Sequence, residues 1–521
     1  MLVKRVLLTT VQRPLEVESE TCAEPAASEM LHARGTRFQG AFAIRSSGPG
    51  WRLDFIAANL EAPTTVLHYP TERALVRELE RGYDFVGIEF AICTFPRVVE
   101  LCALVRRVAP QTKIVLGGDG TVLPECDDHA DYVCRGDGVN LLRRLLGERE
   151  VARFQVPRIT RSVRVLGVNG THEAVLPAGG GCARGCDFYC TSRFFDQSSV
   201  PLLKTGSELH EAMRALHAGG PSHRYIGVVD GDFLADRRRI EPMIPLNQAE
   251  GDGPIQFSCM TSVPSLAQYS TEELLAMGLA GAWIGVESRH AGDSQLRTSD
   301  VYREFGRLRG AGIVTLACMI LGLDWQDEQS LEDDFQHLIS LRPQFSEFML
   351  YCPCPQTPRY AELKREGRLK AVPYRMHDGS HVLVTHPTLS AQRLEALVPE
   401  YYRREYEELG PSVLRVLEVR LEGYLMLRYR VQPHLQARAR EYRSQCLDLY
   451  PLLGLAVRAA PSERVRRWAL GLREELDDTF EIPSAARMKA DIVPALALWA
   501  RLKARVRPHP QPRTEVHRYR L

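Results

Sequence analysis

Short apolar runs alternate with amphipathic stretches twice along the chain, and this alternation constrains the fold more than any other feature. In the first 150 residues the apolar runs lie at 6–10, 64–70, 85–91, 113–121 and 131–138, with stretches of helical spacing between them. Six further strand candidates follow at 173–179, 224–232, 254–262, 281–288, 312–322 and 346–354. Because strand–helix alternation is typical of parallel sheets, we predict an α/β protein.

Within that class, the first series favours an N-terminal doubly wound, Rossmann-like parallel sheet, and the second favours a central partial (β/α)6, TIM-like barrel. A chain of 521 residues is also too long for one core. We expect a domain over residues 1–150, a linker over 151–174, the barrel over 175–390 and a mostly α-helical C-terminal domain over 391–521. Residues 11–60 carry no pattern that places them.

Composition indicates an ordinary globular protein, with 45% hydrophobic and 25% charged residues. No run approaches the ~18 apolar residues of a membrane span, and the N-terminal run lacks the small-residue cleavage site of a signal peptide. The chain has 13 cysteines, an odd number, and most of them lie singly within apolar runs. Both observations fit a reducing cytoplasm. We therefore expect a cytoplasmic protein.

Cys182, Cys186 and Cys190 are clustered within nine residues of a glycine-rich loop that follows a predicted strand. Three thiolates suit zinc or an iron–sulfur cluster. A closed zinc site needs a fourth ligand, and the nearest later histidine is His210. Three thiolates on a [4Fe-4S] cluster would instead leave one iron free for a ligand. We predict the cluster, with zinc or free thiols as the alternative.

This loop resembles the C-x3-C-x2-C motif of radical S-adenosylmethionine (SAM) enzymes, with one extra residue before the third cysteine. The resemblance implies that Cys182, Cys186 and Cys190 are the catalytic and metal-binding residues and that SAM binds the free iron. Either Phe188 or Tyr189 would then face the adenine of SAM.

Further motifs agree with that family in order along the predicted barrel. An acidic turn ends the second strand, a G-V-E-S run ends the fourth, and a glycine follows the fifth. The resemblance implies that these positions contact SAM, with the acidic turn near its amino group and the glutamate near its ribose. The SAM-binding residues predicted in this way are Asp230, Asp232, Glu287, Ser288 and Gly322.

Two glycine-bearing turns follow strands of the first series. Ligands of open α/β sheets bind beyond the carboxyl ends of strands, although the spacing equally fits ordinary tight turns. No G-x-G-x-x-G dinucleotide fingerprint is present. The sheet resembles the cobalamin-binding domain of one radical SAM subclass, which implies cobalamin contacts at Gly117, Gly118, Gly120, Thr121, Gly136 and Gly138. The D-x-H-x-x-G motif is absent, so the lower face of cobalamin should lack that histidine.

The resemblance implies a reaction and its partners. A flavodoxin or ferredoxin would reduce the [4Fe-4S] cluster, which would then cleave SAM reductively. Methylcobalamin would donate a methyl group to an unactivated carbon. Cyclisation, ring contraction, carbon–carbon coupling and a non-catalytic binding role are the alternatives.

The C-terminal segment bears on the substrate of that reaction. Net charge is +1, but residues 401–521 carry a surplus of arginine interleaved with apolar runs. That pattern fits either a solvated helical cap or a peripheral contact with the inner membrane face. We expect a lipid, isoprenoid or natural-product substrate and do not expect a nucleic acid.

Overall fold

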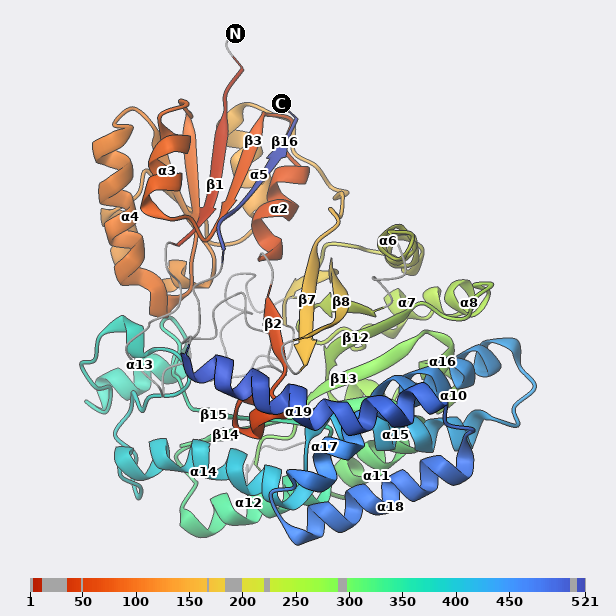
Figure 1. The fold of residues 1–521 in the computed structure, drawn as a ribbon. Coiled ribbons are helices and arrows are strands. Elements are labelled where there is room, and N and C mark those ends of the chain that lie inside the picture. The colour runs from red at the N-terminus through yellow and green to blue at the C-terminus, as the bar shows by residue number, and fades with distance from the viewer. Residues whose placement is uncertain are drawn as a thin grey trace.

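The computed structural model of the chain describes residues 3–11, 35–47, 50–165, 168–182, 199–219, 225–288, 298–506 and 513–520. Two large sheets organise these residues, one at the N-terminus and one in the centre, with helices packed around both (Figure 1). The α/β class predicted from the sequence is confirmed.

The first sheet has the strand order β16-β3-β1-β4-β5-β6. Its five parallel strands coincide with the five predicted runs: β1 Val6–Thr10, β3 Thr64–His68, β4 Phe85–Glu89, β5 Lys113–Gly117 and β6 Tyr132–Val133. β1, β3 and β4 are buried at every position because helices cover both faces of the sheet. One face packs on α3 Glu72–Leu79 and α4 Phe95–Val108, and the other on α2 Trp51–Ala58 and α5 Gly138–Leu146.

The second sheet has the order β15-β14-β13-β12-β11-β8-β7-β2. Six adjacent parallel strands match the six predicted strands in order: β8 Val168–Pro177, β11 Tyr225–Val229, β12 Gln256–Thr261, β13 Leu279–Gly285, β14 Val314–Leu321 and β15 Phe345–Leu350. Antiparallel strands β7 Thr160–Val165 and β2 Arg45–Ser47 extend one edge. The result is a curled half-barrel rather than a closed one.

Helices cover the convex face of the half-barrel: α6 Gly206–His217, α7 Arg237–Ile240, α8 Met243–Gln248, α9 Val263–Leu266, α10 Thr271–Ala276, α11 Thr298–Gly310 and α12 Glu328–Ser340. Alternate strand residues such as Ile284, Ala317 and Phe348 belong to the core that these helices share. Because side chains alternate along a strand, Trp283, Cys318 and Glu347 face the concave interior. α13 Pro358–Arg365 follows the last strand.

The C-terminal segment is helical as predicted, with one exception. Its helices are α14 Ala391–Leu409, α15 Ser412–Leu427, α16 Pro433–Leu449, α17 Leu452–Arg458, α18 Glu463–Thr479 and α19 Ser484–Val506. The exception is β16 Glu515–Tyr519, which returns to the first sheet and pairs antiparallel with β3 (Figure 1). A five-residue strand with polar side chains carries no strong local signal, so the sequence did not predict it.

Buried arginines of this segment bind backbone carbonyls at the amino-terminal end of the half-barrel. Arg420 on α15 donates to the carbonyl oxygen of Gly312, just before β14, and Arg438 on α16 donates to that of Leu279, the first residue of β13. Both side chains are at most 5% exposed. Some arginines of the C-terminal segment therefore serve to dock its helices onto the barrel.

Of the apolar C-terminal runs, 450–457 lies in the core of the helical segment, and 421–430 lies only partly in it, since Tyr429 is 80% exposed. Leu421, Leu453 and Leu455 pack there with Phe42 from the N-terminal region. Across the described residues, no helix combines the length and apolar character needed to cross a membrane.

Glycines allow α15 to meet the barrel backbone to backbone. A Cβ on Gly423 would lie 2.5 Å from the Cα of Gly312 and 2.6 Å from the Tyr442 ring. We predict that Gly423→Ala destabilises the protein by about 1–3 kcal/mol because the helix must move away from the barrel. Gly471→Ala on α18 is the matched control, since no atom lies within 4 Å of its added Cβ. Thermal unfolding midpoints measure both, and equal midpoints for the two variants would contradict this packing.

Candidate functional site

A two-stranded ribbon holds both ends of the cysteine loop. β9 Gly179–Gly181 pairs antiparallel with β10 Ser199–Pro201, directly after the first strand of the half-barrel. Cys182 follows β9 and is half-buried. Cys186, Cys190, Phe188 and Tyr189 lie outside the described residues. The structure therefore places the first predicted cluster ligand at the carboxyl end of the first barrel strand.

The predicted acidic turn after β11 lies against the base of this loop. A Cβ on Gly231 would lie 2.2 Å from the carbonyl oxygen of Gly181 and 3.0 Å from the Cβ of Cys182. A Cβ on Gly179 would likewise lie 2.3 Å from a carboxylate oxygen of Asp230. Only glycine permits such a close approach, so these glycines bring the two predicted motifs together.

Asp230 forms a buried ion pair with Arg239 of α7, at 2.9 Å between Oδ2 and Nη1. The same guanidinium donates to the carbonyl oxygens of Ala178 and Leu203, at 2.6 and 2.9 Å. Those two carbonyls flank the ribbon on either side of the cysteine loop. Asp230 and Arg239 therefore hold both ends of the loop at a fixed separation.

Asp232 is bound by three hydroxyl groups near the end of β12. Thr261, Ser262 and Ser265 donate to its carboxylate at 3.1, 2.9 and 3.0 Å. Both acids of the predicted SAM motif thus have protein partners that fix the turn beside Cys182.

Glu287 and Ser288 lie two and three residues beyond the end of β13, close to the predicted strand end. Glu287 has a positive φ of 55°, and burial raises the pKa of its carboxyl to about 7. Its Oε2 atom is buried without a hydrogen-bond partner among the described residues. Ser288 is buried and accepts a hydrogen bond from the indole of Trp325. Glu287 is therefore the predicted SAM residue with a carboxyl oxygen available to a ligand.

The turn at Gly322 ends β14 with a positive φ of 89°. Its amide donates to the side-chain oxygen of Gln326 at 2.7 Å, and the same oxygen accepts from Leu323. The left-handed backbone favours glycine here, so the turn itself accounts for the residue.

Sequence reasoning missed two acidic residues on the concave face of the half-barrel. Glu173 on β8 is buried against Gly227 of β11, and burial raises its pKa to about 7. Glu347 on β15 is also buried and lies 3.5 Å from the thiol of Cys318. A glutamate inside an apolar strand run was the available signal in both cases. These side chains place carboxyl groups in the interior, where the charge of Arg161 on β7 partly offsets that of Glu173.

The glycine turns after β5 and β6 lie at the carboxyl edge of the first sheet. Gly118 has a φ of 95°, and a Cβ on Gly120 would lie 2.1 Å from the ring of Phe90. Thr121 donates to the carbonyl oxygen of Gly118 at 2.8 Å, which closes this turn. The remaining predicted contacts in the two turns are Gly117, Gly136 and Gly138, of which Gly138 packs on Ile56. Packing around Phe90 and Ile56 thus accounts for several of these glycines.

Charged residues that the sequence analysis did not single out gather at the same edge. Arg52 at the start of α2 bridges Glu89, at the end of β4, and Asp119 at 3.2 and 3.1 Å. Glu89 is buried, and its Oε2 has no hydrogen-bond partner among the described residues. Burial lowers the pKa of Arg161 on β7, while the nearby Glu173 of the second sheet and Tyr69 and Glu89 of the first sheet act to raise it. Carboxyl ends of the first sheet therefore point towards the second sheet (Figure 1).

Comparison with known proteins gives a fold but no sequence family. No family model and no curated protein matches the chain. One similar solved structure is the radical SAM methyltransferase TsrM from Kitasatospora setae with cobalamin and a [4Fe-4S] cluster bound. It has a TM-score of 0.51 and 15% identity, and the alignment covers 85% of this chain and 99% of that chain.

A second structure of TsrM contains tryptophan substrate and the SAM analogue aza-SAM. It has a TM-score of 0.50 and 15% identity, covering 92% of this chain and all of that chain (100%). At this identity the likeness shows that the two chains share a fold over most of their lengths. The three groups named for TsrM are the three cofactors that the sequence predicted here.

The buried Arg239–Asp230 pair gives a stability prediction. We expect Arg239→Met to destabilise the protein by about 3–5 kcal/mol, because Asp230 would remain buried without its counter-charge. The double variant Arg239→Met/Asp230→Asn should recover part of the loss, since it removes the stranded charge. Thermal unfolding measures all three proteins. If the double variant is less stable than Arg239→Met, the buried charge of Asp230 is not what destabilises the single variant.

Glu287 gives a pH prediction. Its pKa is raised from 4.5 to about 7 in the folded chain, so the unfolded chain releases this proton first as pH rises. Stability should therefore fall between these two pH values and remain reduced above the higher one. Glu287→Gln removes this dependence and should unfold at a higher temperature than the parent at about pH 8 but not at about pH 5. Glu475→Gln, at an exposed position on α18, is the control. Parallel pH profiles for the parent and Glu287→Gln would contradict the prediction.

Proposed function

We propose that this chain is a cobalamin-dependent radical SAM enzyme that methylates an unactivated carbon of a small molecule. The observation that carries the proposal is the position of Cys182. It begins a three-cysteine loop at the carboxyl end of the first strand of a half-barrel, in a chain that shares its fold with TsrM. Cys182, Cys186 and Cys190 would hold the [4Fe-4S] cluster.

The described residues fit the proposed cofactors. Soft thiolates suit an iron–sulfur cluster. SAM carries a sulfonium and an ammonium charge, and the interior that would receive it contains the buried carboxyls of Glu173, Glu287 and Glu347. Cobalamin would lie at the carboxyl edge of the first sheet, where Glu89 has a buried carboxyl oxygen without a partner among the described residues.

When bound, the cluster and SAM supply radical chemistry, and cobalamin supplies the methyl group. The chain's own residues position these groups and exclude water. Arg239 and Asp230 fix the loop base, so that Cys182 has one position relative to the barrel mouth. Glu287 holds a proton near neutral pH and would release it when a cationic ligand supplies a counter-charge. Helices α15 and α16 close the opposite end of the barrel.

The substrate we propose is a small molecule bound between the two sheets. The apolar run at 450–457, one of those on which a membrane contact would depend, lies in the protein core, whereas Ile492 at the start of the last run is 47% exposed. We therefore propose a small molecule first and keep a lipid as the alternative. Cyclisation, ring contraction or carbon–carbon coupling remains the alternative outcome of the same cofactors. Electrons would come from a flavodoxin or ferredoxin.

Product analysis under anaerobic conditions tests the proposal. Protein reconstituted with iron, sulfide and cobalamin is given reductant and SAM, with a panel of small-molecule substrates. We expect 5′-deoxyadenosine and S-adenosylhomocysteine by mass spectrometry, and we expect Cys190→Ala to abolish both because the cluster loses a ligand. Cys102→Ala, which removes a cysteine on α4, is the matched control and should retain activity.

The pattern of products separates the candidate functions. Deoxyadenosine without S-adenosylhomocysteine would favour cyclisation or coupling over methylation. Absence of both products from cluster-loaded protein across the panel would contradict the enzymatic proposal and favour a binding role.

A further inference from the structure

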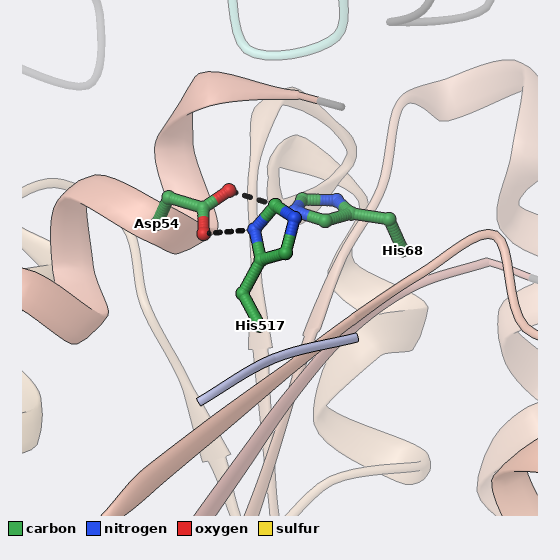
Figure 2. Close-up of side chains that lie close together, drawn as sticks. All are labelled: Asp54, His68 and His517. Carbon is green, nitrogen blue, oxygen red and sulfur yellow. Dashed lines mark hydrogen bonds and ion pairs between the residues drawn. The ribbon is translucent and has the colours of Figure 1, made fainter. Parts of the chain in front are cut away.

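Three side chains with metal-binding donor atoms meet at the edge of the first sheet, from segments far apart in the sequence. They are Asp54 on α2, His68 at the end of β3 and His517 on β16 (Figure 2). One donor atom of each lies within 4.8 Å of the donor atoms of the other two. The proposed function uses none of these residues.

Hydrogen bonds already hold this cluster together. Nε2 of His68 lies 2.7 Å from Oδ2 of Asp54, and Nδ1 of His517 lies 2.7 Å from Oδ1 (Figure 2). The Tyr519 hydroxyl also donates to Oδ1 at 2.7 Å. Both imidazoles therefore direct a ring nitrogen at the same buried carboxylate. The three groups that could bind a metal ion are thus already held close together.

Two imidazole nitrogens and one carboxylate form a ligand set of zinc and neighbouring divalent transition metals. In a tetrahedral zinc site the ligand atoms lie about 3.3 Å apart, because each is about 2.0–2.1 Å from the ion. The two hydrogen bonds of 2.7 Å, one to each carboxylate oxygen, are shorter than this by about 0.6 Å. A small rotation of the side chains would therefore admit an ion between them.

The surroundings also suit a metal site. Asp54 and His68 have side chains 2% and 0% exposed, whereas His517 is 37% exposed and provides a route of entry from solvent. The second ring nitrogen of His517 lies 3.8 Å from the carboxylate of Glu515. A carboxylate behind a histidine ligand is a common way to orient the ring towards a metal. Complete burial of His68 beneath α2 excludes a ligand as large as cobalamin.

We propose that Asp54, His68 and His517 bind one divalent transition-metal ion of the zinc class, with water as the fourth ligand. On binding, the ring nitrogen of each histidine that now faces Asp54 gives its lone pair to the ion, and the proton of a neutral imidazole moves to its other ring nitrogen. The bound ion joins β16 to β3 and α2, and thereby fastens the C-terminus to the first sheet. This proposal is independent of the proposed function, because its ligands are nitrogen and oxygen atoms rather than the loop thiolates.

Cobalt(II) absorption tests the site in the full-length chain. Cys182→Ala/Cys186→Ala/Cys190→Ala is the background, since loop thiolates would otherwise bind the same ion. We expect saturation at one Co²⁺ per chain, with visible ligand-field bands and no thiolate-to-metal charge-transfer band, and displacement by Zn²⁺. His517→Gln keeps a hydrogen-bonding side chain beside Asp54 but removes the ligand, and should weaken Co²⁺ binding by more than about 100-fold.

His381→Gln is the matched control, because His381 pairs with the carboxylate of Asp378 at 3.0 Å. This variant should bind Co²⁺ as the background protein does. Absence of saturable Co²⁺ binding, or equal affinity in the His517→Gln variant, would overturn the proposal. The cluster would then serve only to hold β16 against α2 and β3 through hydrogen bonds.

Amide hydrogen exchange on the unvaried chain gives a second readout that does not depend on folding of a variant. Zn²⁺ should slow exchange of the β16 amides relative to protein kept in chelator. Unchanged exchange in β16 would also overturn the proposal.

Discussion

The ion pair between Arg239 and Asp230 is the contact on which the arrangement of the candidate site depends. One guanidinium binds the acidic turn after β11 and the two backbone carbonyls that flank the cysteine loop. Its side chain is 6% exposed and that of Asp230 1%, so water cannot replace either partner without opening the core. A backbone hydrogen bond from Ala178 to Val229 joins the same two segments, and the ion pair adds a side-chain contact that also reaches Leu203.

Buried arginines perform the same task elsewhere in the molecule. Arg415, Arg420 and Arg438 lie on the C-terminal helices. Each donates a hydrogen bond to a backbone carbonyl at, or one or two residues before, the start of a barrel strand. A guanidinium has five donors in a fixed plane, and can satisfy several acceptors that a lysine could not reach together. These three arginines of the C-terminal segment thus help to attach it to the barrel, whereas others, such as Arg428 and Arg440, are exposed.

The carboxyl edges of the two sheets carry different charged groups. The half-barrel contributes an interior with the carboxyls of Glu173 and Glu287, whose pKa values burial raises to about 7. The first sheet contributes Arg52, Glu89 and two tight glycine turns. A positively charged ligand would lower the cost of ionising the interior acids, which couples binding to proton release.

The sequence by itself determined the parallel strands of both sheets, because periodicity and strand propensity are local properties of each run. β8 and β11 to β15 lie where the sequence placed them, and Cys182 and Glu287 follow strands as expected. Local patterns could not reveal that β16 pairs with β3, that Glu173 faces the interior, or that Arg239 anchors Asp230. Each of these depends on contacts between residues far apart in the chain, and only folding brings their side chains within reach. The meeting of Asp54, His68 and His517 is the clearest case, since single histidines and an aspartate have no spacing that marks a site.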